Sequence, residues 1–241
     1  MNLFVFGGNR FMGKSLVKEL MRLNFNVTIF NRSGTGPTGA NIIQGDRNNL
    51  KDIKKINFKE YDYIFDMCLF KPKQYKLIEK YLVESNLKKY IFISSAAVNN
   101  KFAGDQVASL YFCNDYALEK ERVENLIKKT KLNYTIIRPV YVVGEDNHRP
   151  RLSYFINKIL NDRPIPIKGK GDNLINLVHI SDVVELIKAS MYTYDRETLI
   201  ASNGQNLSIN DIITKISEFL NTKEFTIINE PNNTFNNSDF V

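Results

Sequence analysis

A tyrosine and a lysine stand four positions apart in the middle of the chain, as Tyr116 and Lys120. Side chains at positions i and i+4 of an α-helix lie on one face, one turn apart. An unperturbed tyrosine has a pKa of about 10, and a neighbouring ammonium group favours its phenolate form. The spacing therefore predicts a pair in which Tyr116 acts as a general acid/base near neutral pH.

Two serines, Ser94 and Ser95, stand at the end of an apolar run. Ligands meet a parallel sheet at the carboxyl ends of its strands. A serine there is placed to hydrogen-bond a carbonyl or alcohol oxygen of a substrate. The alternative is that both serines only shape a turn or cap a helix.

Three glycines near the start of the chain lie between an apolar run and a helical pattern. Gly7 permits a tight turn, Gly13 lets the helix approach the strand closely, and N–H groups at the helix start can hold a pyrophosphate. The alternative is a turn that merely joins the two elements. The predicted phosphate-binding residues are Gly7, Gly8, Asn9, Arg10, Phe11, Met12 and Gly13.

Two arginines bear on the type of dinucleotide. Arg10 lies in the middle of the turn, and Asn31 and Arg32 follow the second predicted strand with no acidic residue beside them. Because NAD sites usually carry an acid there and arginine suits a 2′-phosphate, NADP is favoured over NAD. Asp46 either accepts a hydrogen bond from the adenine amino group or is an ordinary turn residue. Arg47 is counted with it as a cofactor residue.

Apolar runs typical of strands alternate with helical patterns over the first 145 residues. This order predicts an α/β fold with a doubly wound parallel sheet, the Rossmann arrangement. The predicted strands cover 2–6, 26–30, 41–44, 63–66, 90–94 and 134–138, and the predicted helices cover 14–23, 73–85 and 117–129.

Prolines interrupt the chain after residue 138 and change its rhythm. Helices are predicted over 152–160, up to 191 with Ser181 as N-cap, and over 209–220 with Ser208 as N-cap. Extended segments are predicted over 165–167 and 225–228, and a frayed end over 232–241. We therefore expect a Rossmann domain over 1–145 and a small substrate lobe over 146–241, either minimal or truncated, that interleaves with it.

These motifs together resemble the extended short-chain dehydrogenase/reductase superfamily, and specifically the NAD-dependent epimerase/dehydratase family. The resemblance runs over most of the chain, although Arg10 replaces the usual middle glycine. It is carried by the turn 7–13, Ile43-Gln44-Gly45-Asp46, Ile93-Ser94-Ser95-Ala96-Ala97-Val98, Tyr116 with Lys120, Arg138-Pro139-Val140-Tyr141-Val142-Val143-Gly144 and Val178-His179-Ile180-Ser181-Asp182-Val183.

The resemblance implies a role for each member of a catalytic set. Tyr116 would move the proton, and Lys120 would lower the pKa of Tyr116 and bind the nicotinamide ribose. Ser95, rather than Ser94, would hold the reacting oxygen.

Three further positions are implied as ligand contacts. Pro139 and Val140 would lie near the nicotinamide. Arg151 falls where related sequences carry a substrate-facing arginine and could pair with a nucleotide-sugar diphosphate. The alternative is a surface arginine in a loop.

The implied activity is that of a nucleotide-sugar epimerase or 4-ketoreductase. A dehydratase is disfavoured because Ala96 and Ala97 stand where those enzymes carry acidic residues. The alternative is a non-catalytic NAD(P)-binding protein, regulatory or RNA-binding, on the same fold. The net charge of this chain, +7, fits this alternative. The lysines are scattered, however, so nucleic-acid binding is disfavoured.

Composition restricts the setting. No apolar run is long enough to span a membrane, and no signal peptide is recognised. Two cysteines, Cys68 and Cys113, and two histidines, His148 and His179, have no metal-binding spacing, so we expect no metal and a cytoplasmic location. The resemblance also implies a homodimer as one option, formed through the helix that carries Tyr116.

Overall fold

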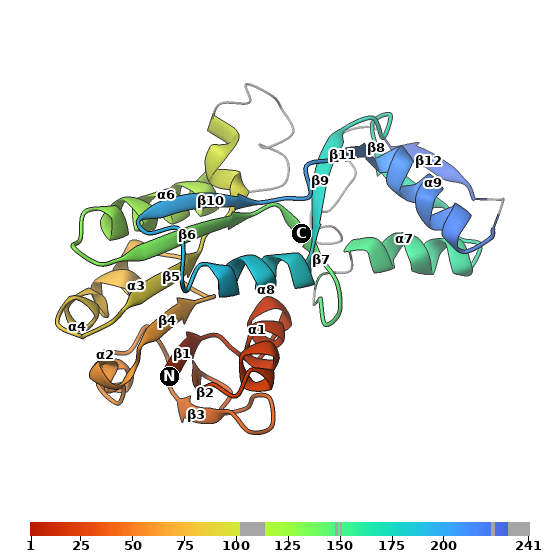
Figure 1. The fold of residues 1–241 in the computed structure, drawn as a ribbon. Coiled ribbons are helices and arrows are strands. Elements are labelled where there is room, and N and C mark those ends of the chain that lie inside the picture. Colours follow the sequence, from red (N-terminus) through yellow and green to blue (C-terminus); the bar gives the residue numbers. More distant parts are fainter. Residues whose placement is uncertain (102–113, 148, 150, 223–224, 231–241) are drawn as a thin grey trace.

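A seven-stranded parallel sheet forms the centre of the computed structural model (Figure 1). The structure describes residues 1–101, 114–147, 149, 151–222 and 225–230. Cys113, His148 and the segment 232–241 lie outside the described residues. The strand order is β10-β6-β5-β4-β1-β2-β3. The order of the strands reverses between β1 and β4, which places the ligand crevice of such a sheet at the carboxyl ends of these two strands.

The strands of this sheet come from both halves of the chain. Six belong to the first 139 residues, and β10 joins the sheet from much later in the sequence, pairing with β6. Their bounds are β1 Asn2–Phe6, β2 Asn26–Asn31, β3 Asn41–Gln44, β4 Tyr63–Asp66, β5 Lys89–Ile93, β6 Tyr134–Pro139 and β10 Glu197–Ala201.

Helices cover both faces of the sheet because its strands are apolar on both faces. Leu3 and Val5 of β1 pack into one core with α1 and α8, while Phe4 and Phe6 pack into a second core with α3, α4 and α6. The helical segments are α1 Phe11–Arg22, α2 Leu50–Ile53, η1 Phe58–Glu60, α3 Pro72–Lys76, α4 Glu79–Val83, η2 Ala96–Lys101, α6 Asn114–Lys128 and α8 Ile180–Ala189. Among the described helices, none has the length and apolarity needed to cross a bilayer.

A third core lies apart from the sheet, to the right in Figure 1. It joins Phe155 and Ile159 of α7 (Arg151–Leu160) to Ile212 and Ile213 of α9 (Ile209–Phe219). Two small sheets accompany it, one of β12 and β8 and one of β11, β9 and β7. Their bounds are β7 Tyr141–Val143, β8 Ile165–Lys168, β9 Leu174–His179, β11 Asn206–Ser208 and β12 Ile227–Glu230.

The structure corrects two predictions of helix boundaries. The helix predicted over 73–85 is divided into α3 and α4 at Leu77 and Ile78. Ser181 is not the N-cap of α8, because this helix begins at Ile180, two residues before the predicted start. The N-cap is His179, whose side chain accepts a hydrogen bond from the Ser181 N–H. Ser208 is confirmed as the N-cap of α9, where it forms a capping box with Asp211.

Candidate active site

The glycine turn after β1 is packed too closely for side chains. A Cβ on Gly13 would lie 2.1 Å from the Gly7 carbonyl oxygen, and one on Gly8 would lie 2.6 Å from Cγ2 of Ile29. Gly7 has a φ of +83°, and a Cβ there would meet Sγ of Cys68 at 3.0 Å. The turn therefore abuts the segment after β4, so the ends of β1 and β4 meet at the expected crevice. The turn is therefore bare backbone, on which the pyrophosphate of a dinucleotide would rest at the start of α1.

The start of α1 carries the other predicted phosphate contacts. Arg10 is the extended N-cap residue, and its side chain is exposed. Phe11 opens the helix with a φ of +40°, which is uncommon for a residue other than glycine. Its ring is buried in the core, so packing holds the strained backbone in place.

The loop after β2 is bonded to the glycine turn. Asn9 donates a 2.9 Å hydrogen bond to Ser33, and Ser33 in turn donates to Asn31. Asn31 is buried and also bonds Thr35, so its side chain shapes this loop. The exposed Arg32 lies beside Ser33 in the sequence, which brings it to the same end of the sheet as the turn.

Asp46 and Arg47 follow β3 but face different surroundings. Asp46 accepts hydrogen bonds from the main chain and side chain of Asn48, and these bonds lower the pKa of Asp46. Arg32 lies close enough to lower it further. The Arg47 guanidinium is turned inward and is nearly inaccessible, and the contact of Arg47 with a cofactor stays a prediction.

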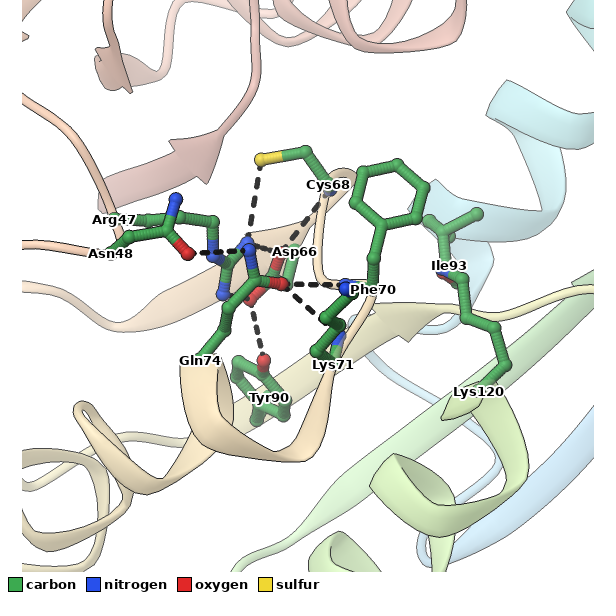
Figure 2. A network of polar contacts seen from close by, with 10 residues as sticks. All are labelled: Arg47, Asn48, Asp66, Cys68, Phe70, Lys71, Gln74, Tyr90, Ile93 and Lys120. Carbon is green, nitrogen blue, oxygen red and sulfur yellow. Dashed lines mark hydrogen bonds and ion pairs between the residues drawn. The ribbon is translucent and has the colours of Figure 1, made fainter. Parts of the chain in front are cut away.

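Arg47 belongs to a buried ionic cluster beneath the crevice (Figure 2). Its two terminal nitrogens lie 2.6 and 2.8 Å from the carboxylate oxygens of Asp66, the last residue of β4. Tyr90 donates to the same carboxylate at 2.8 Å, and Arg47 also contacts Cys68 Sγ at 3.3 Å. Because the Asp66 carboxylate is paired with both terminal nitrogens of Arg47, the cluster can stay charged inside the protein, although the buried Nε of Arg47 has no hydrogen-bond partner among the described residues. It ties the ends of β3 and β4 to the first half of β5.

The structure brings Ser95, Tyr116 and Arg151 together. The Tyr116 phenol is hydrogen-bonded to Ser95, and Arg151 acts on it electrostatically. Burial raises the pKa of Tyr116, while the Ser95 bond and the positive charge of Arg151 oppose that rise. Arg151 is held by a 3.0 Å bond to the Val142 carbonyl and by stacking on Tyr141. The arrangement can hold a proton at the phenol oxygen next to a fixed positive charge.

Lys120 lies one turn further along α6 and is almost fully buried. Its ammonium group donates a 2.8 Å hydrogen bond to the Ile93 carbonyl, and the rings of Phe70 and Phe92 each lie 4.8 Å from it. Burial lowers the pKa of Lys120 to about 7. The same ammonium group lies 5.8 Å from the centroid of the Tyr116 ring, and Arg151 adds a second positive charge near the phenol. The predicted effect of Lys120 on the pKa of Tyr116 stays a prediction.

Glu124 was not anticipated from the sequence. It lies one more turn along the face of α6 that carries Tyr116 and Lys120, and it accepts hydrogen bonds from Ser94 at 2.6 Å and from Arg138. Ser94 is thus bonded inside the protein, which leaves Ser95 as the serine next to Tyr116. The repetition at i+4 and i+8 was the signal that could have found Glu124.

Pro139 and Val140 lie where β6 ends. Pro139 is buried beside Ala201 of β10, and the Val140 N–H donates to the Ala201 carbonyl. Both residues therefore border the carboxyl edge of the sheet, as their predicted nearness to a nicotinamide requires. Within the described residues, no group of three or more His, Cys, Asp or Glu is arranged to hold a metal ion.

Comparison with known proteins decides the family. The model of the NAD dependent epimerase/dehydratase family matches residues 73–200, somewhat more than half of the chain. The chain belongs to this family. Members of the family thus share the segment that contains Ser95, Tyr116, Lys120 and Arg151.

Curated relatives of this family member are distant. The chloroplast stem-loop binding protein of 41 kDa b from Arabidopsis thaliana is 26% identical over 206 residues, which are 75% of this chain and 52% of that protein. A UDP-glucose 4-epimerase of Vibrio cholerae is 24% identical over 153 residues, which are 58% of this chain and 46% of that enzyme. The chain thus spans about half the length of these relatives.

Solved structures share the family fold. UDP-glucose 4-epimerase from Thermotoga maritima, solved with UDP-glucose, superposes with a TM-score of 0.78 at 18% identity, covering 97% of this chain and 87% of that one. UDP-N-acetylglucosamine 4-epimerase from Methanobrevibacter ruminantium, in complex with UDP-N-acetylmuramic acid, gives 0.77 at 22% identity, covering 95% and 85%. These likenesses confirm the predicted Rossmann fold.

Proposed function

We propose that this protein is an NAD(P)-dependent nucleotide-sugar epimerase or 4-ketoreductase. One observation carries the proposal: the Tyr116 phenol is hydrogen-bonded to Ser95 beside Arg151, at the same edge of the sheet as the glycine turn. Membership of the epimerase/dehydratase family supports the class of reaction.

Each protein group has a defined task in such a reaction. The bare backbone of the turn around Gly7 and Gly13 binds the pyrophosphate of the cofactor. When bound, the nicotinamide supplies the hydride chemistry. Tyr116 moves the proton at the sugar oxygen, and Ser95 orients that oxygen.

The protonation state of Tyr116 favours one direction of transfer. Since burial raises the pKa of Tyr116, the phenol carries its proton at neutral pH. A protonated phenol donates to a carbonyl oxygen as the hydride reaches the carbon, which is the step of a ketoreductase and the second half-reaction of an epimerase. The first half-reaction of an epimerase needs the phenolate, which the Arg151 charge stabilises.

Arg151 is suited to the anionic part of the substrate. Its guanidinium is half-buried and fixed by Val142 and Tyr141, which removes much of the entropy cost of binding. We propose that it contacts the diphosphate of the nucleotide sugar. The segment containing α7 and α9 would then form the substrate lobe, as the predicted division near residue 145 implies.

NADP and NAD are the two candidate cofactors. The exposed Arg10 and Arg32 favour NADP through charge-assisted bonds to a 2′-phosphate. Structural neighbours favour NAD, since UDP-glucose 4-epimerase of Thermus thermophilus was solved in complex with it.

A panel of nucleotide sugars tests the proposal, with each of NAD, NADH, NADP and NADPH. Epimerisation or ketone reduction by the wild type should fall by about 100-fold or more in Tyr116→Phe, with cofactor binding retained. Tyr192→Phe, on a largely exposed tyrosine, is the matched control. Turnover of the panel that is equal in wild type and Tyr116→Phe would overturn the acid/base role, and the absence of any turnover would overturn the activity.

A second candidate is an RNA-binding protein on this fold. It is favoured by the similarity to the Arabidopsis stem-loop binding protein and by the net charge of +7. Binding of a stem-loop RNA that weakens steeply between 50 and 200 mM salt, without turnover of any sugar, would support this candidate instead.

A further inference from the structure

We infer that Phe70 is a positioning residue whose ring holds Tyr116 and Lys120 in place. The side chain of Gln74 in turn fixes the backbone of Phe70. The inference rests on the proposed function for its catalytic consequence, but the placement of Phe70 can be tested without it. Phe70 follows β4 at the crevice, and its side chain is 44% exposed. This partly exposed ring lies beside the buried ammonium group of Lys120.

The ring contacts both members of the pair. Its centroid lies 4.8 Å from Nζ of Lys120 and 6.3 Å from the centroid of the Tyr116 ring, at a tilt of 45°. A cation this close to a ring face is attracted by the ring quadrupole. Phe92 lies under the same ammonium group from inside the sheet, so Lys120 is enclosed between two rings. Phe70 is the enclosing ring that borders solvent.

Gln74 fixes the segment that carries this ring. Its buried side-chain oxygen accepts hydrogen bonds from the backbone N–H groups of Phe70, at 2.9 Å, and of Lys71, at 3.1 Å. Its side-chain nitrogen donates to Asn48 at 3.0 Å. Figure 2 shows this bridge, with Asn48 and Arg47 on one side of Gln74 and Phe70 and Lys120 on the other. The loop after β3 is therefore linked to the cover of Lys120.

The cover has a chemical consequence for Lys120. The titratable and charged groups that face Lys120 are Asp66, Cys68 and Glu124, which raise its pKa, and Arg47, which lowers it. Removing the ring would leave these groups in place, admit water to the ammonium group and relieve the desolvation that lowers the pKa of Lys120 to about 7. Lys120 would then be charged throughout the neutral range, and the Tyr116 ring would lose its packing contact with the Phe70 ring. The acid/base pair would change both its orientation and its pH dependence.

The test measures the pH dependence of Lys120 acetylation with acetic anhydride, followed by mass spectrometry of the Lys120 peptide. We expect the pH midpoint of Lys120 acetylation to rise by about one pH unit or more in Phe70→Ala. In Gln74→Ala the same midpoint should rise by a smaller amount. Asn48→Ala keeps both bonds that Gln74 accepts and should stay near the wild type. Phe219→Ala, on an 85% exposed ring of α9, is the matched control, and exposed Lys59 is the internal reference.

Turnover separates the inference from the proposed function. In the active enzyme, Phe70→Ala should lower kcat by about 10- to 100-fold and shift its pH profile, while Phe70→Leu, which keeps an apolar cover, falls in between. An unchanged Lys120 midpoint in folded Phe70→Ala, shown by an unaltered melting transition, would overturn the inference. A shifted midpoint in a protein without any sugar turnover would support the cover and overturn the proposed activity.

Discussion

Ser94 donates a 2.6 Å hydrogen bond to Glu124, two turns of α6 beyond Tyr116. The carboxylate of Glu124 also takes two bonds from Arg138 at the end of β6, and Arg138 reaches on to Asn99. One buried acid therefore ties the helix of the acid/base pair to the ends of β5 and β6. The helix cannot turn about its axis without breaking these bonds.

Loss of Glu124 should be costly for stability. Glu124→Ala leaves the half-buried Arg138 without its counter-ion, so we expect the free energy of unfolding to fall by about 3 kcal/mol or more. Urea denaturation measures this change. Glu119→Ala, on the same helix, breaks only the surface pair with Arg122 and should cost less than about 1 kcal/mol. Equal losses in the two variants would contradict the structural role of Glu124.

The glycine turn allows a matched pair of substitutions. A Cβ on Gly13 would lie 2.1 Å from a backbone oxygen of the turn, whereas a Cβ on Gly36 would meet the flexible end of Ile29 at the same distance. Gly13→Ala should therefore abolish measurable NAD(P) binding, and Gly36→Ala should change the dissociation constant by no more than about threefold, because a single side-chain end moves at a cost of at most about 0.7 kcal/mol. Calorimetric titration checks both, and retained binding in Gly13→Ala would refute the phosphate site.

Arg10 and Arg32 are the residues proposed to bind a 2′-phosphate and so to select NADP over NAD. Arg10→Ala and Arg32→Ala should each weaken NADP binding by about 10- to 100-fold, the worth of a charge-assisted hydrogen bond, and leave NAD binding nearly unchanged. Dissociation constants for both dinucleotides measure this. Tighter binding of NAD than of NADP in the wild type, unaffected by either substitution, would disprove the NADP preference.

Glu19 should contribute to the free energy of unfolding in a way that depends on pH in the acid range. Its bonds to Arg22 and Lys188 lower its pKa to about 2. A lowered pKa stabilises the folded state above the ordinary value near 4.5, and this stabilisation disappears as the pH falls toward 2. Lys188→Met should therefore flatten the fall in stability between pH 5 and 2, by about 0.5–1 kcal/mol after solvent screening. Lys80→Met, which removes a loose 3.8 Å surface pair, should leave the profile unchanged, and a wild-type slope in Lys188→Met would refute the linkage.

The sequence predicted the buried strands well because a strand covered on both faces is a continuous apolar run. The bounds predicted for the buried strands β1 and β4 match the structure to the residue. The bounds of β3 also match, although this edge strand is mostly exposed. By contrast, β9 and β10 are half-exposed and were missed, because their apolar residues come only in runs of two or three. The division of the helix over 73–85 was also missed, since neither glycine nor proline marks the break at Leu77 and Ile78.

The nearness of Ser95 to Tyr116 was implied by the family resemblance, which sets a serine after β5 beside a tyrosine on the helix that follows. The pairing of Arg47 with Asp66 was not, because nothing local indicates that an arginine after β3 is buried against an acid 19 residues away. A carboxylate that ends a buried strand was the available signal, since it requires a cation. The inward turn of Lys120 also depends on Phe70, whose side chain is placed by a loop.

The pairing of β10 with β6 has a consequence for how the protein is made. Glu197 lies opposite Thr135, and Lys89 donates to the carbonyls of Ser190 and Thr193, more than 100 residues later in the chain. A ribosome must therefore synthesise about 200 residues before the edge of β6 is covered. Until then the nascent chain exposes an open strand edge, which is a site of misassociation with other chains. The topology thus places the risk of misassociation in the interval between the synthesis of β6 and that of β10.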